Sequence, residues 1–355
     1  MEPTIFERIH AGLSEKRANL VRWAQTVAPE KKFLRLGPAG PGAMDRHLEL
    51  LDKSICCADD QTLGRCMVCG DTVNPRLLES DFTACVCLDH LSAWERQRLE
   101  AELELSQVIQ RALLPEATPS IPGMEVAFFS RPAEILGGDF LGFFHYKDGS
   151  YGIAIADVAG HGISTSALMA SVQTALHTLV PASDSPAEVL RRVNRFFCHN
   201  VNFTTFVTLF LARWDATRRH MCFANAGHNP GLLLRADGVD RQSVDWLEPT
   251  GPAIGLVEDF DIETREFPLR VNDLIVLYTD GVTEATDPSG QEYGARGLVN
   301  VVLQEPGGSA QQVLARLRHD LQGFIDGRPL ADDTTALVCR VIDEHSPSVS
   351  SPRTP

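Results

Sequence analysis

The sequence predicts an α+β fold in which strands and helices form separate layers. Short turns separate apolar, β-rich segments such as Phe206–Trp214, His220–Asn225 and Gly231–Ala236, and such connections favour antiparallel pairing. Two segments with helical periodicity, Ser164–Leu179 and Pro186–Asn200, are grouped between the strands. Runs of strands with grouped helices are typical of layered α+β domains.

The other elements follow from local signals. The segment Ser309–Phe324 is predicted to be a helix because it follows the loop Pro306–Gly308. The N-terminal segment Thr4–Val27 has helical periodicity, and Gly37–Gly42 ends that pattern as a linker. The segment Leu91–Leu114 is rich in Glu, Arg, Gln and Leu and contains no Gly or Pro, which predicts a long helix.

These signals divide the chain of 355 residues into one large domain and smaller parts, as its length also favours. The predicted parts are an N-terminal helical segment (1–54), a cysteine-rich module (55–92), a linker helix (93–116), the large α+β domain (117–342) and a disordered tail (343–355). The tail is expected because it is rich in Ser and Pro.

Composition limits the classes of partner. The hydrophobic fraction of 44% is enough for a core, and the charged fraction of 22% is ordinary. The net charge of −15 argues against nucleic acid or an anionic membrane surface as the main partner. No segment has the length of apolar sequence that spans a membrane, and the first residues lack the basic start and apolar run of a secretory signal. We therefore expect a cytoplasmic protein.

Acidic residues next to glycine or to another acidic residue occur in four separated motifs. Asp157 follows the run Tyr151–Ala156, and Asp280 follows Leu274–Thr279. A strand that ends in a carboxylate next to glycine presents that carboxylate at a sheet edge. Carboxylates gathered in this way repel one another unless a hard divalent ion neutralises them, and oxygen ligands favour Mg²⁺ or Mn²⁺. The motifs therefore predict a site for two such ions.

The ordered set of motifs resembles the PPM-type metal-dependent serine/threonine phosphatases, in particular their bacterial SpoIIE/RsbU branch. The matching stretches are Arg131–Phe140, Asp157–Gly162, Ala167–Ala170, Phe206–Phe210, Asn225–Pro230, Gly251–Leu256, Tyr278–Glu284 and Asp332–Thr335. A single Asp-Gly pair is an ordinary turn signal, but the ordered set is specific. The resemblance implies two stacked β-sheets flanked by helices, with the metal ions between the sheet edges.

By the same resemblance, Asp157 would bridge both metal ions, and the Val158 carbonyl would assist at one of them. Asp139 would serve the second ion, while Asp280 and Asp332 would hold the first. Two such ions activate a shared water for attack on a phosphate, without a phosphoenzyme. The chain has neither the cysteine-x5-arginine motif of thiol phosphatases nor a G-x4-G-K-[ST] loop, so phosphate hydrolysis would have to use metals.

Several positions keep two interpretations. Asp333 is expected to be an outer-shell or substitute ligand beside Asp332. His161 either positions substrate or water, or only fits a tight turn, and Asn225–His228 either shapes a strand end or takes part in catalysis. Leu141-Gly142 stands where the family often has another acidic residue, so affinity for the second ion is expected to be modest.

Six of the nine cysteines lie between Cys56 and Cys87, which requires a separate explanation. The C-x2-C-G pattern and a following C-x2-H pair resemble a treble-clef zinc site. The predicted zinc ligands are Cys66, Cys69, Cys87 and His90, with Cys85 as an alternative ligand and Cys56 or Cys57 as possible additions. The alternatives are a redox switch and buried, inert cysteines.

The predicted linker helix carries apolar residues at spacing like that of a coiled coil. They are Trp94, Ala101, Leu105, Val108 and Ala112, and Arg98 interrupts them. The helix either packs on its own domain or forms a homodimer that transmits a signal from the zinc module.

The functional hypothesis is a Mn²⁺- or Mg²⁺-dependent protein serine/threonine phosphatase regulated by the N-terminal module. By resemblance, its substrate would be a phosphoserine or phosphothreonine on a STAS-type anti-sigma-factor antagonist in a partner-switching pathway. The alternative is a non-catalytic partner-binding scaffold with a metal- or redox-sensing N-terminal module. The four aspartates Asp139, Asp157, Asp280 and Asp332 argue against that alternative, because a scaffold has no need of them.

Overall fold

The structure is a computed structural model, and it forms two compact units, Met1–Glu102 and Leu103–Pro355. It describes residues 10, 13–14, 17–18, 21–22, 48–49, 51–57, 63, 65–66, 69, 114–115, 117–133, 137–158, 163–200, 206–237, 243–257, 261–328 and 330–343. In the first unit, the described residues 51–57 are helical. The second unit contains every strand and helix described below.

Ten strands in the second unit form two five-stranded sheets in which all neighbouring strands are antiparallel. The first sheet has the order β1-β10-β9-β6-β7, with bounds Met124–Arg131, Thr334–Val341, Leu274–Tyr278, Gly231–Leu234 and Val244–Leu247. The second has the order β2-β3-β4-β5-β8, with bounds Phe140–His145, Tyr151–Val158, Val207–Asp215, His220–Ala226 and Arg265–Pro268.

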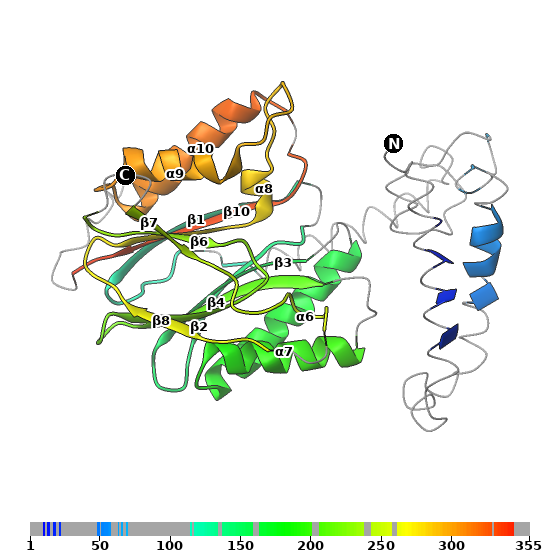
Figure 1. Ribbon diagram of the computed structural model, residues 1–355, viewed down its shortest axis with the longest axis horizontal. Helices are drawn as coiled ribbons and strands as arrows, with labels where there is room; N and C mark the ends of the chain where they lie inside the picture. The colour runs from blue at the N-terminus through cyan, green and yellow to red at the C-terminus, as the bar shows by residue number, and fades with distance from the viewer. Residues whose placement is uncertain are drawn as a thin grey trace, which may run out of the picture. The chain divides into compact units, whose positions relative to one another are not determined.

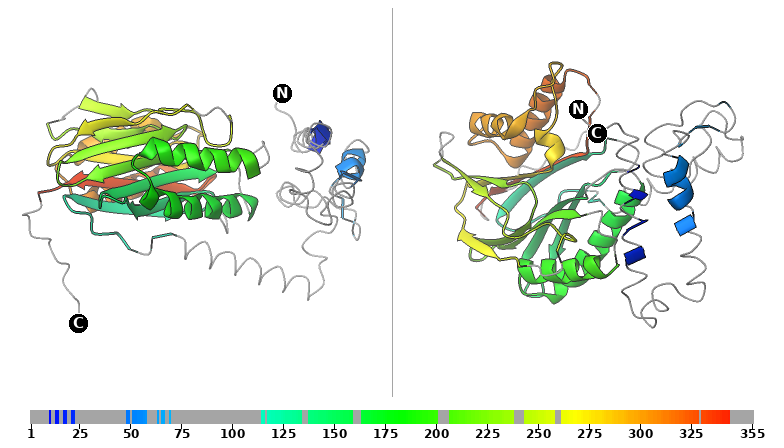
Figure 2. Two further views of the ribbon diagram at one scale, coloured as in Figure 1. Left: turned by 90° about the horizontal axis from the view of Figure 1, so that it is seen from below. Right: turned by 45° about the vertical axis from the view of Figure 1, so that its right-hand side comes forward.

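Helices cover the outer face of each sheet (Figure 1). Helices α6 (Ile163–Leu179) and α7 (Pro186–Asn200) pack on the second sheet, with the short 3₁₀ helix η2 (Val180–Ala182) between them. Helices α9 (Gly294–Gln304) and α10 (Ala310–Ile325) cover the first sheet, and the single-turn helix α8 (Asp280–Thr283) follows β9. Figure 2 shows α6 and α7 lying side by side.

Three hydrophobic clusters fill the spaces between these four layers. The cluster between the sheets includes Phe210, Trp214 and Leu337, each of which is fully buried. A second cluster joins α6 and α7 to their sheet, and a third joins α9 and α10 to theirs. All eight residues of β10 are buried, because this strand is covered on both faces. The apolar burial fixes the sheets against each other, and therefore fixes the strand ends.

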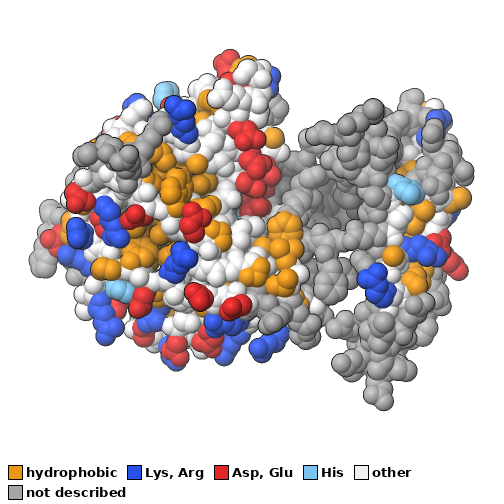
Figure 3. Space-filling view, viewed as in Figure 1, with side chains coloured by type: hydrophobic (Ala, Val, Ile, Leu, Met, Phe, Trp, Pro, Cys, Tyr) orange, Lys and Arg blue, Asp and Glu red, His pale blue; other side chains and the backbone are white. Residues whose placement is uncertain are grey.

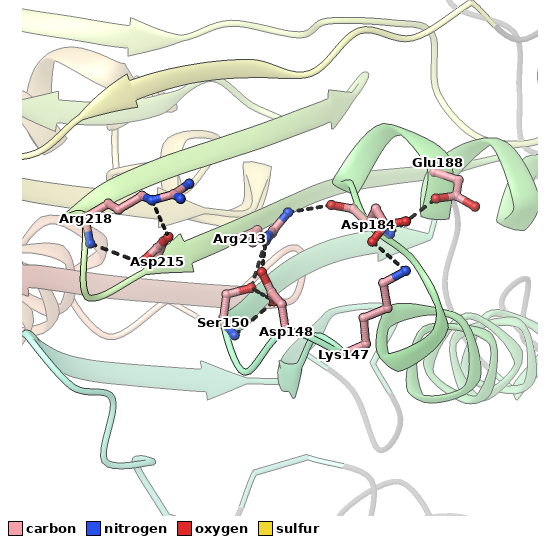
Figure 4. A network of polar contacts seen from close by, with 8 residues as sticks. All are labelled: Lys147, Asp148, Ser150, Asp184, Glu188, Arg213, Asp215 and Arg218. Carbon is pink, nitrogen blue, oxygen red and sulfur yellow. Dashed lines mark hydrogen bonds and ion pairs between the residues drawn. The ribbon is translucent and has the colours of Figure 1, made fainter.

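A polar network holds the turn between β2 and β3 against the start of α7 (Figure 4). The guanidinium of Arg213 in β4 donates to the Ser150 hydroxyl over 2.7 Å and to the Asp184 carbonyl, and it pairs with the carboxylate of Asp148. Lys147 pairs with the Asp184 carboxylate over 2.6 Å. Arg213 lies beside Gly152 in the sheet, whereas Asp157 lies nearer the other end of β3. The network therefore fixes the strand end opposite to the acidic residues.

The predicted α+β fold with two sheets and flanking helices is confirmed for the second unit. Helix α7 has the predicted bounds, and α10 is shifted by one residue from the expected Ser309–Phe324. Helices α8 and α9 were not predicted. The predicted linker helix lies outside the described residues, except at its C-terminal end, and so does most of the predicted zinc module. Among the described residues, no helix is long and apolar enough to cross a membrane.

Candidate metal centre

Antiparallel register brings the acidic motifs together in pairs, one pair from each sheet. Asp139 directly precedes β2, and because Phe140 pairs with Ala156, it lies beside the end of β3 that carries Asp157. Asp280 begins α8 two residues after β9 ends, and β9 pairs with β10 so that Ala336 lies opposite Tyr278. The residues just before β10, Asp332 and Asp333, therefore lie beside Asp280.

The electrostatics show that the two pairs lie close to each other across the sheets. The pKa of Asp157 is raised to about 7, first because the carboxyl is buried and then because Asp280 and Asp332 are nearby negative charges. Burial and the charge of Asp332 also raise the pKa of Asp280. Acidic side chains gather on the surface beside α8 (Figure 3). The sheet edges therefore concentrate negative charge, and the charged groups that shift the pKa of Asp157 are all acidic.

Asp139 is held by threonine hydroxyls from the opposite sheet. The Thr279 hydroxyl donates to Asp139 Oδ2 over 2.8 Å, and the backbone amide of Thr335 donates to that same hydroxyl over 3.0 Å. Burial raises the pKa of Asp139 well above its usual range, while hydrogen bonds from Thr335 and Thr279 lower it in part. This chain of hydrogen bonds crosses from the first sheet to the second and fixes the orientation of the Asp139 carboxylate.

Asp333 binds backbone rather than facing open space. Its Oδ1 accepts a hydrogen bond from the Ala133 amide over 2.8 Å, and its Oδ2 accepts one from the Gly138 amide. Burial raises the pKa of Asp333, and these two amides partly offset that effect. Asp333 is 8% exposed, whereas the neighbouring Asp332 is exposed. Asp333 therefore holds the backbone segment that leads to Asp139. The Asp332 carboxylate remains more accessible.

Two glycines allow the backbone segments at the site to approach closely. A Cβ atom on Gly281 would lie 2.0 Å from the carbonyl oxygen of Asp333, a distance that no side chain tolerates. A Cβ atom on Gly138 would lie 2.8 Å from Thr165 Cγ2 and 3.1 Å from the Val158 carbonyl oxygen. The Asp-Gly and Gly-Gly-Asp motifs are therefore required by packing as well as by turn geometry.

The donor set suits hard divalent ions, although the described side chains do not enclose one. Among the residues that the structure describes, no three His, Cys, Asp or Glu side chains form a ready set of metal ligands. Nevertheless, burial and then the charges of Asp280, Asp332, Asp333 and Glu284 raise the pKa of Asp157, and a bound cation removes that charge repulsion. Carboxylate and carbonyl oxygens are the ligands that Mg²⁺ and Mn²⁺ prefer. The chemistry of these side chains therefore suits Mg²⁺ or Mn²⁺.

Other predicted positions are described only in part. His161 lies outside the described residues, and so do Cys85, Cys87 and His90 of the predicted zinc site. Cys66 is buried and Cys69 is exposed. Sequence reasoning did not find Thr279 as a partner of Asp139. The only signal would have been its place directly before Asp280.

Glu284 also belongs to the electrostatic surroundings of the site. The side chain is exposed, yet burial and the charge of Asp280 raise its pKa. Asp280 begins the single turn of α8, and Glu284 directly follows that turn. The short helix therefore presents two acidic residues toward the same region.

The fold and the acidic strand ends define a known class of protein, the PP2C-type or PPM phosphatases. The SiaA PP2C domain of Pseudomonas aeruginosa has the same fold, with a TM-score of 0.61 and 24% identity, covering 70% of this chain and 99% of that one. The RsbU and RsbW domains of Rv1364c from Mycobacterium tuberculosis align with a TM-score of 0.54 and 26% identity, covering 63% of each chain.

The sequence places the chain within that class. Residues 147–342 match the family described as Stage II sporulation protein E (SpoIIE), and the chain belongs to this family. The phosphoserine phosphatase RsbU of Bacillus subtilis is 30% identical over 245 residues, which are 69% of this chain and 71% of RsbU. The predicted enzyme class, a phosphatase of the PPM type, is confirmed.

Proposed function

We propose that the chain is a Mn²⁺- or Mg²⁺-dependent phosphatase that hydrolyses phosphoserine or phosphothreonine on a regulatory protein. The observation that carries this proposal is the convergence of acidic residues from both sheets, which adds to the effect of burial in raising the pKa of Asp157 to about 7. A fold that gathers uncompensated carboxylates at one edge loses stability by doing so, unless a cation binds there. Such a cost at one defined place is typical of a functional site.

Each acidic residue has a separate role in this proposal. Asp157, at the end of β3, would be a ligand shared by the ions, and the Val158 carbonyl would assist. Asp280 and Asp332 of the first sheet would hold one ion, and Asp139 would serve the other. Asp333 keeps the segment around Gly138 in place through its two amide contacts. Asp332 is the exposed member of the set, so it is the one that can move to complete the coordination.

When bound, two divalent ions lower the pKa of a shared water and orient a phosphate for in-line attack. The chain's own residues orient the carboxylates that would bind these ions. Thr279 and Thr335 hold the Asp139 carboxylate in one orientation. The acidic surroundings repel a free phosphate group, so the phosphorylated side chain is admitted only when cations are present.

The substrate is proposed from the relatives. RsbU of Bacillus subtilis is named a phosphoserine phosphatase, and this chain spans 71% of it. We extend that substrate class to this chain and, from the resemblance of the motifs, specify a STAS-type antagonist in a partner-switching pathway. Protein substrates require an open site rather than a closed pocket, which agrees with the exposure of Asp332 and Glu284.

The deciding experiment is hydrolysis of a phosphoserine peptide and of a generic phosphate ester at increasing Mn²⁺ concentration. Asp157→Asn and Asp280→Asn are compared with the wild type and with Asp287→Asn, because Asp287 only caps a turn with Ser289 and Gln291. We expect the first two variants to lose on the order of 100-fold or more of kcat/KM, and Asp287→Asn to lose little. A folded wild type without Mn²⁺-dependent activity would contradict the proposal.

The N-terminal unit is proposed to hold a structural zinc ion through Cys66, Cys69, Cys87 and His90, with Cys85 as the alternative ligand. The support is the spacing of these residues in the sequence. Metal analysis of the reduced full-length protein tests this, since the proposal requires one zinc per chain that Cys66→Ser removes. Zinc at far below one per chain would refute it.

The segment 93–116 is proposed to be a linker helix through which two chains associate. The support is its apolar spacing, including Leu105 and Val108. Light scattering decides this point, since Leu105→Glu is expected to halve the mass if the wild type is a dimer. A mass that does not change would refute this part.

A further inference from the structure

The turn after β5 contains a buried histidine next to strands that end at the proposed metal centre. His228 is 2% exposed, and its Nδ1 lies 2.9 Å from the hydroxyl of Thr208 in β4. The imidazole also lies beside the backbone of Tyr278 at the end of β9. Among the residues that the structure describes, Nε2 has no well-aligned hydrogen-bond partner. His228 thus lies where the ends of β4 and β9, from different sheets, come together.

The Thr208 hydroxyl connects this histidine to the proposed bridging aspartate. Thr208 pairs with Asp157 across β3 and β4, and its Oγ1 lies 3.4 Å from the Asp157 carbonyl oxygen. A hydroxyl has one proton to donate. If the hydroxyl donates its hydrogen bond to the Asp157 carbonyl, it accepts a hydrogen bond from Nδ1–H of His228. Nδ1–H of the imidazole, the hydroxyl and the carbonyl then form one directed chain.

The histidine is itself rigidly held by the Asn225 side chain. Asn225 is fully buried, and its Oδ1 accepts the His228 amide over 2.8 Å. Its Nδ2 donates to the His228 carbonyl over 3.1 Å and to the Leu247 carbonyl over 3.2 Å. Leu247 ends β7 of the other sheet, so Asn225 also connects the two sheets. The whole turn is therefore fixed relative to both sheets.

We propose that His228 is a positioning residue that acts through Thr208 on the backbone of Asp157 and so sets where the end of β3 lies relative to the end of β9. The inference rests on the proposed function, because its consequence is the spacing between Asp157 and Asp280 at the metal centre. The histidine itself contacts neither metal nor substrate.

Packing alone does not explain a histidine at this position. An apolar side chain would fill the same space without burying two polar ring nitrogens, and burying polar atoms costs free energy. The imidazole is instead suited to contact two strand ends at once, since its two nitrogens lie on different sides of the ring. One lies against Thr208, and the ring also meets the Tyr278 backbone.

The test measures Mn²⁺ binding directly by calorimetric titration of the full-length protein, together with kcat and KM. Thr208→Val removes the hydroxyl and keeps the shape, so we expect the dissociation constant for Mn²⁺ to rise by about 10- to 100-fold. Thr208→Ser restores the hydroxyl and is expected to recover most of the affinity. The matched control is Thr264→Val, because among the described residues the hydroxyl of this half-buried threonine accepts a hydrogen bond from the Ala187 amide at α7, away from Asp157.

A second variant, His228→Gln, is compared with the Thr208→Val His228→Gln double variant. Because both residues act along one path, the double variant is expected to bind Mn²⁺ no more weakly than the weaker single variant. If His228→Gln does not fold, the Mn²⁺ affinities of Thr208→Val and Thr208→Ser alone test the proposal.

The two proposals fail in different ways. Wild-type Mn²⁺ affinity in folded Thr208→Val, in a protein that is otherwise active, would overturn the role of His228 and leave the phosphatase proposal intact. A loss of affinity that Thr208→Ser does not restore would also overturn it, because the hydroxyl would then not be the connecting group. Wild-type protein that neither binds Mn²⁺ nor hydrolyses phosphate would overturn the proposed function and this inference with it.

Discussion

At the scale of single residues, Asp157 illustrates how a functional site weakens the fold that carries it. Partial burial of its carboxyl, followed by the charge repulsion from Asp280 and Asp332, opposes its ionisation and raises its pKa to about 7. Without divalent ions, Asp157→Asn removes this repulsion, so we expect a free energy of unfolding about 1–3 kcal/mol higher at pH 8. Urea unfolding in the presence of a chelator measures this. A variant less stable than the wild type would show that the repulsion is not the dominant effect.

His228 predicts a free energy of unfolding that falls as the pH falls. Burial lowers its pKa to about 4, from about 6.5 in an unfolded chain. The folded state therefore binds fewer protons than the unfolded state between these values, so the contribution of His228 to stability is present above about pH 6.5 and is lost as the pH falls toward 4. We expect wild type to lose about 2 kcal/mol more than His228→Gln between pH 7 and pH 5 in urea titrations. Parallel curves for the two proteins would contradict this.

The positions of the acidic residues at strand ends were predictable one by one, but their hydrogen-bond partners were not. Asp139, Asp157, Asp280 and Asp332 each follow or precede a recognisable strand pattern. By contrast, the Thr279 hydroxyl meets Asp139 across 140 positions of sequence, and only the packing of the two sheets brings them together. Likewise, Asp273 lies fully buried at a turn, where its carboxylate accepts hydrogen bonds from the Ala236 and Arg270 amides.

At the scale of elements, local signals decided which helices could be predicted. Helix α7 begins with a proline at a position that favours helix starts and has a strongly amphipathic pattern. Helix α10 has a capping box formed by Ser309 and Gln312. Helix α9 was missed because it contains Gly294 and Gly297 in its first turns and no side chain caps its start. It forms because Leu298, Val299, Val301 and Val302 are buried against the sheet, and that tertiary contact is absent from local patterns.

Glycine-to-alanine substitutions distinguish positions where a side chain would clash from positions where it would not. Gly323 lies in α10, where an added Cβ atom would meet open space, so Gly323→Ala is expected to raise the free energy of unfolding by about 0.5–1 kcal/mol. Gly281→Ala would place its Cβ 2.0 Å from a backbone oxygen of Asp333, and we expect it to lower stability by more than about 2 kcal/mol. Thermal unfolding of both variants, with Gly307→Ala as an exposed control, measures the difference. Equal effects at 281 and 323 would contradict the close approach.

At the scale of the whole molecule, the second unit carries its own core. All three hydrophobic clusters consist of residues between Ile121 and Val341, and they fill the spaces between two sheets and their helices. The first unit is compact by itself and ends at Glu102. A unit with a continuous core of this kind folds cooperatively without help from a neighbour.

This division predicts that residues 103–355 unfold as they do within the full chain. Calorimetry of the full-length protein and of residues 103–355 alone is expected to show the same main transition within about 2 °C, because no part of the three clusters is removed. A chelator that removes the proposed zinc ion from the full-length protein should therefore leave that transition unchanged when Mn²⁺ is absent from the start. If the main transition of residues 103–355 falls by about 10 °C or more, the first unit contributes to the stability of the phosphatase fold, and the two units cannot be treated as energetically independent.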